Sequence, residues 1–239
     1  MRGLAPFWID PRDTSHTFPD ISLALDEPDG LLSVGGDLSP GRLLAAYRHG
    51  IFPWYNHGQP ILWWSPNPRA VLFPHKLHVS RSLRKTLRQQ HFEITTDTAF
   101  SRVIEACSTP RDNANSGTWI TEEMQQAYRH LFELGHAHSV ECWLDGELVG
   151  GLYGLGIGKV FFGESMFSRA RDASKVAFVQ WVRQLEQWGY ALVDCQVHSA
   201  HLESLGAETI DREHFRQLLD HGCPQVGHTG QWTILSPES

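Results

Sequence analysis

The sequence has 239 residues, of which 41% are hydrophobic and 20% are charged. This composition can build the core of one large domain or of two smaller ones, and it argues against a disordered chain. No segment approaches the roughly 20 consecutive apolar residues that a membrane span needs, and the N-terminal residues have no apolar signal-peptide core. The four cysteines are too widely spaced for a disulfide framework or a zinc knuckle, so we expect a cytoplasmic protein with reduced thiols.

The formal net charge of −7 argues against a nucleic-acid partner, but the charges are unevenly distributed. No acidic residue occurs between Asp37 and Glu93. A solvated basic face is one interpretation of this window; the other is a surface for nucleic acid, because aromatic rings among cations can stack bases while the cations pair with phosphates. The basic residues of the window are Arg42, Arg48, Arg69, Lys76, Arg81, Arg84, Lys85 and Arg88, and its interleaved aromatic residues are Trp54, Tyr55, Trp63 and Trp64.

The first half of the chain predicts several short helices. A helix is expected from Pro40 to Gly50, because Ser39 can cap it, proline fits a first turn and glycine ends it. The proline-rich stretch that follows predicts loops and edges, with a domain junction that divides the chain into a small N-terminal domain over 1–70 and a second domain over 71–239. Further helices are predicted over 81–90, 99–107 and 122–134. In the first of these, leucines face inward and four cations face outward: Arg81, Arg84, Lys85 and Arg88.

The second half of the chain changes period. Strands are predicted over 139–144 and 148–155, joined by the turn signal Asp145-Gly146, and a third strand over 159–167. A helix beginning at Asp172 and ending at Gly189 precedes a fourth strand over 190–197. A strand, helix, strand succession of this length predicts a parallel crossover, so the last two strands are expected to be neighbours. Three antiparallel strands, a helix and a parallel strand are the order of GNAT-type acyltransferases, and the predicted class is α+β with a GNAT-like mixed sheet.

Two acidic residues are expected at the carboxyl ends of these neighbouring strands. Alternation places Glu164 on one face of its strand, and it places Asp194 and Gln196 together on one face of theirs, opposite Cys195. A buried carboxylate needs a partner or changes its pKa, so a polar or cationic ligand is expected there. Cys195 is interpreted as a packing residue rather than a nucleophile.

Other motifs argue against a cofactor. The glycines of GLYGLGIG do not lead into a helix, and no phosphate-binding GxxxxGK[ST] motif occurs, so neither a dinucleotide nor ATP is expected. The pairs His75/His78 and His198/His201 have no carboxylate or cysteine at a matching interval, so no metal is expected.

Eight motifs in order resemble the leucyl/phenylalanyl-tRNA–protein transferase family: GGDLSP, GIFPW, ILWWSPNPR, GTWI, GESMFSR, ASK, DCQ and HLESLGA. The resemblance covers nearly the whole chain from about residue 18. It implies transfer of leucine or phenylalanine from charged tRNA to a protein that begins with Arg or Lys, which marks that protein for degradation.

The resemblance also implies roles for individual residues. Asp194 would hold the acceptor ammonium and take its proton, or act chiefly as an electrostatic anchor, while Gln196 would orient the ester or the amine. Glu164 would bind the cationic side chain of the acceptor. Trp54 and Trp119 would stack the terminal adenosine of the tRNA, whose body would lie on the basic window. The aminoacyl side chain would be surrounded by Leu152, Phe178, Trp181, Leu185 and Val193.

Two other functions fit part of the sequence. An N-acetyltransferase using acetyl-coenzyme A has the same strand order, but the loop SRARDAS before the main helix lacks the glycines that cradle a pyrophosphate. A non-catalytic tRNA-binding module would explain the basic window but not the GESMFS and DCQ strands. Preference between leucine and phenylalanine stays open, and we expect a monomer.

Overall fold

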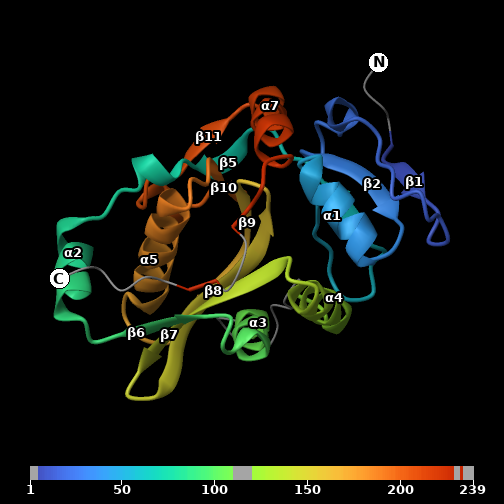
Figure 1. Ribbon diagram of the computed structural model, residues 1–239. Helices are drawn as coiled ribbons and strands as arrows, with labels where there is room; N and C mark the ends of the chain where they lie inside the picture. Colours follow the sequence, from blue (N-terminus) through green and yellow to red (C-terminus); the bar gives the residue numbers. More distant parts are fainter. Residues whose placement is uncertain (1–4, 110–119, 229–231, 234–239) are drawn as a thin grey trace.

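The computed structural model describes residues 5–109, 120–228 and 232–233. They form a four-stranded sheet, in the order β1-β2-β4-β3, and a seven-stranded sheet, in the order β11-β5-β10-β9-β8-β7-β6 (Figure 1). The strands are β1 (Phe7–Ile9), β2 (Leu31–Gly35), β3 (Phe52–Pro53), β4 (Leu62–Trp64), β5 (Arg69–Leu72), β6 (Glu93–Thr96), β7 (Ala137–Leu144), β8 (Glu147–Ile157), β9 (Val160–Ser168), β10 (Leu192–Gln196) and β11 (Glu208–Ile210).

The α-helices are α1 (Pro40–Arg48), α2 (Arg81–Gln89), α3 (Phe100–Ser108), α4 (Glu122–Glu133), α5 (Ala173–Gln187), α6 (Ala200–Glu203) and α7 (Arg212–Gly222), and the 3-10 helices are η1 (Ile21–Leu23) and η2 (Pro74–Lys76). The predicted helix starts are confirmed by their caps: the Ser39 and Ser80 side chains accept from backbone N–H groups of the first turns of α1 and α2.

The GNAT-like α+β fold is confirmed by the middle of the large sheet. β7, β8 and β9 are antiparallel neighbours, α5 follows, and β10 returns parallel to β9. The helices cover both faces of this sheet: α5 packs on one face, while α3 and α4 pack on the other (Figure 1). Alternation along β9 separates the two cores, since Phe161 belongs to the core under α5 and Phe162 to the opposite one.

Some elements were not predicted. β5 enters the large sheet antiparallel to both β10 and β11, although its sequence was interpreted as part of a loop and junction. β5 also spans residue 70, where the boundary between the two domains was predicted. That division into domains stays a prediction. The proline-rich sequence around β5 predicted loops. The strands that pair with β5 lie more than a hundred residues away along the chain, so no local pattern indicated a strand here.

Candidate functional site

A cavity of about 530 Å³ opens where β9 and β10 separate. The two strands pair only from Leu192↔Val160 to Asp194↔Phe162, while β9 continues to pair with β8 as far as Ser168. Because of this gap, residues from both faces of the sheet line the same cavity. The apolar walls are Leu152, Phe161, Met166, Phe178, Val193 and Leu202.

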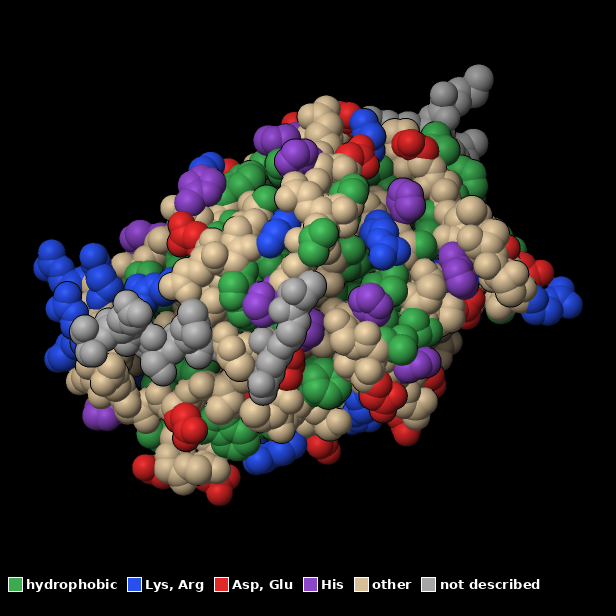
Figure 2. All heavy atoms as spheres, in the orientation of Figure 1, with side chains coloured by type: hydrophobic (Ala, Val, Ile, Leu, Met, Phe, Trp, Pro, Cys, Tyr) green, Lys and Arg blue, Asp and Glu red, His purple; other side chains and the backbone are tan. Residues whose placement is uncertain are grey.

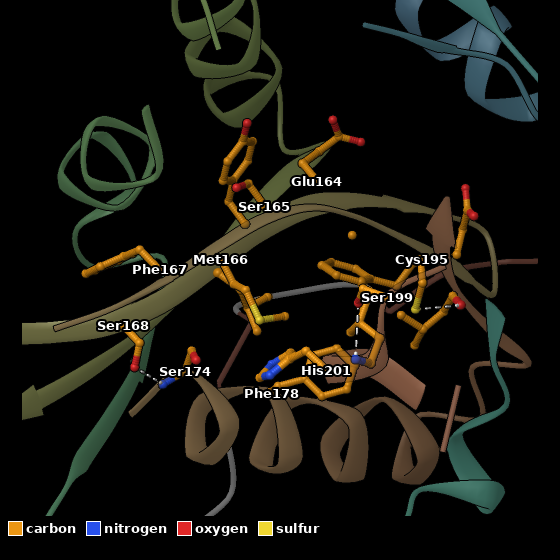
Figure 3. Close-up of a pocket in the computed structure, with 17 residues that line it drawn as sticks. Glu164, Ser165, Met166, Phe167, Ser168, Ser174, Phe178, Cys195, Ser199 and His201 are labelled. Carbon is orange, nitrogen blue, oxygen red and sulfur yellow. Dashed lines mark hydrogen bonds between the residues drawn. The ribbon is translucent and has the colours of Figure 1, made fainter. Parts of the chain in front are cut away.

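The cavity thus has an apolar part against α5 and a polar end at the opposite face. In Figure 3, Met166, Phe178 and His201 lie between the sheet and α5, whereas Glu164 points away from that helix. Glu164 and Asp194 line the cavity at the gap. The prediction that Glu164 lies at the end of its strand is wrong: it lies in the middle of β9, because β9 outlasts its pairing with β10.

Glu164 is a buried carboxylate that accepts three hydrogen bonds. The hydroxyl of Tyr47, on α1, donates to Oε1 at 2.7 Å, that of Tyr128, on α4, donates to Oε2 at 2.8 Å, and Gln196 Nε2 donates to Oε1 at 2.9 Å. Burial raises the pKa of Glu164 to about 7, and the charge of Asp194 adds to this rise, while the three hydrogen bonds oppose it. The carboxyl therefore changes protonation near neutral pH.

Asp194 is fully buried and already has a cationic partner. Arg69 Nε and Nη2 donate to its two carboxylate oxygens at 2.8 and 2.7 Å, in a bidentate pair. The Arg69 guanidinium in turn lies over the rings of Phe52 and Phe215, at 4.7 and 4.6 Å from their centroids, and donates to the carbonyl of Gly50. From the sequence we expected the Asp194 carboxylate to be free for an incoming ammonium, whereas Arg69 occupies both of its oxygens.

Gln196 connects the two carboxylates. Its backbone N–H donates to Asp194 Oδ1 at 2.9 Å, while its side chain reaches Glu164. The register of β10 against β5 shifts between these two residues, and Gln196 has a φ of 62°. A bulge with left-handed backbone is uncommon for a residue other than glycine and is often found beside functional sites. Glu164, Asp194 and Gln196 are therefore brought together on one side of the gap.

The residues predicted to surround the aminoacyl side chain fall into two groups. Leu152, Phe178 and Val193 line the cavity. Trp181 and Leu185 are fully buried in the same core behind it. Phe161, Met166 and His201 also line the cavity but were not predicted. The alternation along β9 that placed Glu164 on one face also places Phe161 on the other face, so the sequence could have indicated Phe161.

Of the two predicted adenosine-stacking residues, Trp54 is described by the structure and does not line this cavity. Trp54 is 44% exposed, its ring lies 6.0 Å from that of Trp64, and Trp64 Nε1 donates to its carbonyl. Trp119 lies outside the described residues.

Only part of the basic window forms a cationic surface. Arg42 and Arg69 are buried in ion pairs with Asp13, Asp37 and Asp194. The four cations of α2 are exposed around a shallow hollow, and they account for the blue cluster at the left of Figure 2. They are Arg81, Arg84, Lys85 and Arg88, which we call the α2 cluster.

Within the described ranges, no group of three or more His, Cys, Asp or Glu side chains could hold a metal ion. None of the helices in this described part of the chain is long and apolar enough to cross a membrane.

Comparison with known proteins gives concordant matches. Residues 36–67 match the model of the N-terminal domain of leucyl/phenylalanyl-tRNA protein transferases, and residues 71–220 match the model described as leucyl/phenylalanyl-tRNA protein transferase. Similar proteins of that name include one from Cellvibrio japonicus, 57% identical over 97% of this chain and 98% of the relative. Another, from Pseudomonas paraeruginosa, is 62% identical over 86% of this chain and 91% of the relative. A solved GCN5-related N-acetyltransferase from Kribbella flavida is more distant, at 14% identity and a TM-score of 0.36 over 71% of this chain and 60% of that one.

Proposed function

The chain belongs to the leucyl/phenylalanyl-tRNA–protein transferase family, and from this premise we propose that its cavity receives the leucyl or phenylalanyl side chain while the edge at Glu164 receives the acceptor amine. The family's activity is the transfer of leucine or phenylalanine from aminoacyl-tRNA to the N-terminus of a protein, an N-end-rule modification. The proposal rests on one observation, that a single cavity combines apolar walls with a buried carboxylate.

The apolar walls suit an aliphatic or aromatic guest and no charged one. Leu152, Phe178 and Val193 offer hydrocarbon and ring surface, and a charged side chain among them would lose its hydration without gaining a partner. Trp181 and Leu185 support these walls from behind. A cavity of about 530 Å³ lies in the range of small-ligand sites.

The reaction exchanges an ester for an amide. The acceptor nitrogen attacks the ester carbonyl, a C–N bond forms, the C–O bond to the ribose breaks, and the amine proton passes to the departing ribose oxygen. An α-amino group has a pKa of about 7.7–8.0, so a weak base is enough to free its lone pair. No nucleotide triphosphate is required.

Glu164 is the carboxylate best suited to meet the acceptor's positive charge. Its pKa of about 7 lies close to that of an α-amino group, so it can hold the ammonium or accept a proton from it. Specificity for an N-terminal Arg or Lys would come from Glu164 binding the cationic side chain of that residue, since the α-amino group is common to all N-termini. Displacing the hydroxyl groups of Tyr47 and Tyr128 in favour of a cation would lower the pKa of Glu164 and so favour its charged form.

Asp194 acts in this proposal as an anchor, and Gln196 as the group that orients the substrate. Support for the anchor role comes from Arg69, which occupies both carboxylate oxygens. Asp194 then fixes the Gln196 backbone, and the amide side chain is left beside Glu164, where it can turn to the ester or the amine.

The tRNA body would contact the α2 cluster, with Trp54 and Trp119 stacking its terminal adenosine. Binding there would depend on phosphates and little on tRNA sequence away from the acceptor end. A cytoplasmic monomer is the state proposed for this chemistry, since aminoacyl-tRNA and new protein N-termini meet in that compartment.

Filling the cavity tests the proposal. Leu152→Phe should lower kcat/KM for Phe-tRNA more than for Leu-tRNA, by roughly tenfold in their ratio, because the larger guest loses its space first. The matched control is Leu155→Phe, an equally buried position on the same strand in the opposite core. An unchanged ratio in folded Leu152→Phe would place the aminoacyl side chain elsewhere, and acetylation of the same Arg peptide from acetyl-coenzyme A would favour the acetyltransferase alternative.

A further inference from the structure

A stack of aromatic rings lies behind the apolar end of the cavity. Phe161 lines the cavity, and its ring lies edge-on to that of fully buried Trp181, with centroids 5.3 Å apart. The ring of Trp232 stacks on that of Trp181, with centroids 5.1 Å apart, and is tilted to that of Phe161, with centroids 6.4 Å apart. Trp232 does not line the cavity, so it can act on it only through Phe161 and Trp181.

Trp232 itself is held from several sides. Its ring lies flat on the imidazole of His138, with centroids 3.4 Å apart and planes within 4°. His138 is fixed by Asp97, whose Oδ2 lies 2.8 Å from Nδ1. The hydroxyl of Thr96 donates to the carbonyl oxygen of Trp232. Only 6% of Trp232 is exposed, so this ring is packed in place and does not lie loosely on the surface.

Two glycines of β8 make room for this stack. A Cβ at Gly156 would lie 2.5 Å from the Trp232 ring, and one at Gly154 would lie 2.7 Å from the Phe161 ring. A larger residue at Gly156 would push the Trp232 ring out of place, whereas one at Gly154 would first meet the Phe162 carbonyl oxygen and then the Phe161 ring. Gly154 and Gly156 of the GLYGLGIG motif therefore have a packing role.

We propose that Trp232 is a positioning residue that sets the depth of the aminoacyl cavity, an inference that rests on the function proposed above. With Trp232 in place, neither Trp181 nor Phe161 can move back from the cavity. Without it, the empty volume lies directly behind both rings, and packed cores partly collapse into such space. The cavity then deepens at its apolar end, which favours the longer phenylalanyl group over the leucyl group.

The test compares kcat/KM for Phe-tRNA and Leu-tRNA with a peptide that begins with Arg. Trp232→Ala is expected to raise the ratio of phenylalanine to leucine transfer by roughly five- to tenfold, within the range that one pocket contact controls. Trp232→Phe keeps a stacked ring and should stay within about twofold of the wild-type ratio. Circular dichroism and Tm measurements establish that each variant is folded.

Leu131→Ala is the matched control. Leu131 is fully buried on α4, in the core on the other face of the sheet, so its loss destabilises the protein without touching the stack. We expect a lowered Tm and an unchanged ratio. A folded Trp232→Ala variant that behaves in the same way would overturn the proposal, because its effect would then be one of stability alone.

Two further variants remove ambiguity. If Leu152→Phe changes the ratio while Trp232→Ala does not, the positioning role is wrong and the function proposed for the cavity stands. If neither changes it, the function proposed for the cavity fails as well. If Trp232→Ala does not fold, Trp232→Leu opens a smaller empty volume at the same position and is measured against the same controls.

Discussion

At the scale of single residues, Asp194 depends on Arg69. Both side chains are fully buried, so removing one of them leaves an unpaired charge inside the protein. We predict that Arg69→Gln lowers the free energy of unfolding by about 3–5 kcal/mol. The double variant Arg69→Gln/Asp194→Asn should lose clearly less than the sum of the two single variants, because no charge is then left unpaired.

Urea unfolding of the four proteins in this cycle measures the coupling. Additive losses would mean that the pair does not act as a unit. If the double variant is folded, the anchor role predicts reduced but measurable turnover, whereas complete loss of transfer would indicate that Asp194 itself takes the proton.

Glu164 gives the protein a pH dependence of known sign. Its pKa is raised from the ordinary value of 4.5 to about 7, so the folded protein favours the protonated form. The resulting contribution to stability is complete below about pH 4.5 and is lost as the pH rises to about 7. We predict that Glu164→Gln removes this loss and is more stable than the wild type at pH 8, by up to about 3 kcal/mol.

Thermal unfolding from pH 5 to pH 8 tests this prediction. The curve of Tm against pH for Glu164→Gln should separate from the wild-type curve as the pH rises, while Glu147→Gln, on the exposed β7–β8 hairpin, should follow the wild type. Curves that stay parallel for Glu164→Gln would show that its carboxyl does not titrate in this range. Transfer to Arg peptides by this variant should be weak at every pH.

The sequence predicted candidate site residues but not their partners. Strand alternation placed Asp194 and Gln196 on one face of their strand and Glu164 on one face of its own, because that pattern is local, and the structure brings the three side chains together. Arg69, Tyr47 and Tyr128 stand 125, 117 and 36 residues away from the carboxylates they contact, and no local pattern reports such pairings. The ion pair of Asp194 with Arg69 was missed for the same reason.

At the scale of elements, α2 is the part of the protein best placed for phosphates. Replacing Arg81, Arg84, Lys85 and Arg88 by Ala should reduce the slope of log affinity for tRNA against log salt by about three, since each phosphate contact adds about 0.7–0.9. Filter binding at several salt concentrations measures this slope. Arg216→Ala, which removes an exposed arginine already paired with Glu213 and Asp220 on α7, should leave it unchanged. Equal slopes for the quadruple variant and the wild type would place the tRNA body on another surface.

Elements with strong local signals were also those predicted best. The capped helices α1 and α2, the β7–β8 hairpin and the amphipathic α5 each carry their own start, period and stop. β5 and β11 have three to four residues each, and they are strands only because β10 and its neighbours offer an edge. Such short strands depend on tertiary pairing, which composition does not encode.

At the scale of the whole molecule, the site is assembled from both sheets. Tyr47 comes from α1 and Phe52 from β3 of the small sheet, whereas Glu164, Asp194 and Arg69 belong to strands of the large one. The aromatic pair Tyr47 and Phe162, with ring centroids 5.2 Å apart, lies at this junction. The uneven distribution of charge is also a property of the whole molecule. The chain has a net charge of −7, yet the four cations of the α2 cluster gather at one end of the large sheet (Figures 1 and 2).

The hydrogen bonds around Glu164 and Asp194 tie the N-terminal part of the chain to the candidate site in the large sheet. A fragment that began after Arg69 would keep every wall of the apolar cavity and the Tyr128 donor to Glu164, yet it would lack the Tyr47 hydroxyl that also donates to Glu164 and the guanidinium that neutralises Asp194. The charge of Asp194 would then be unpaired inside the protein, close to Glu164. Such a fragment would keep the surface proposed to receive a hydrophobic side chain while losing the charge balance of the site proposed for its transfer.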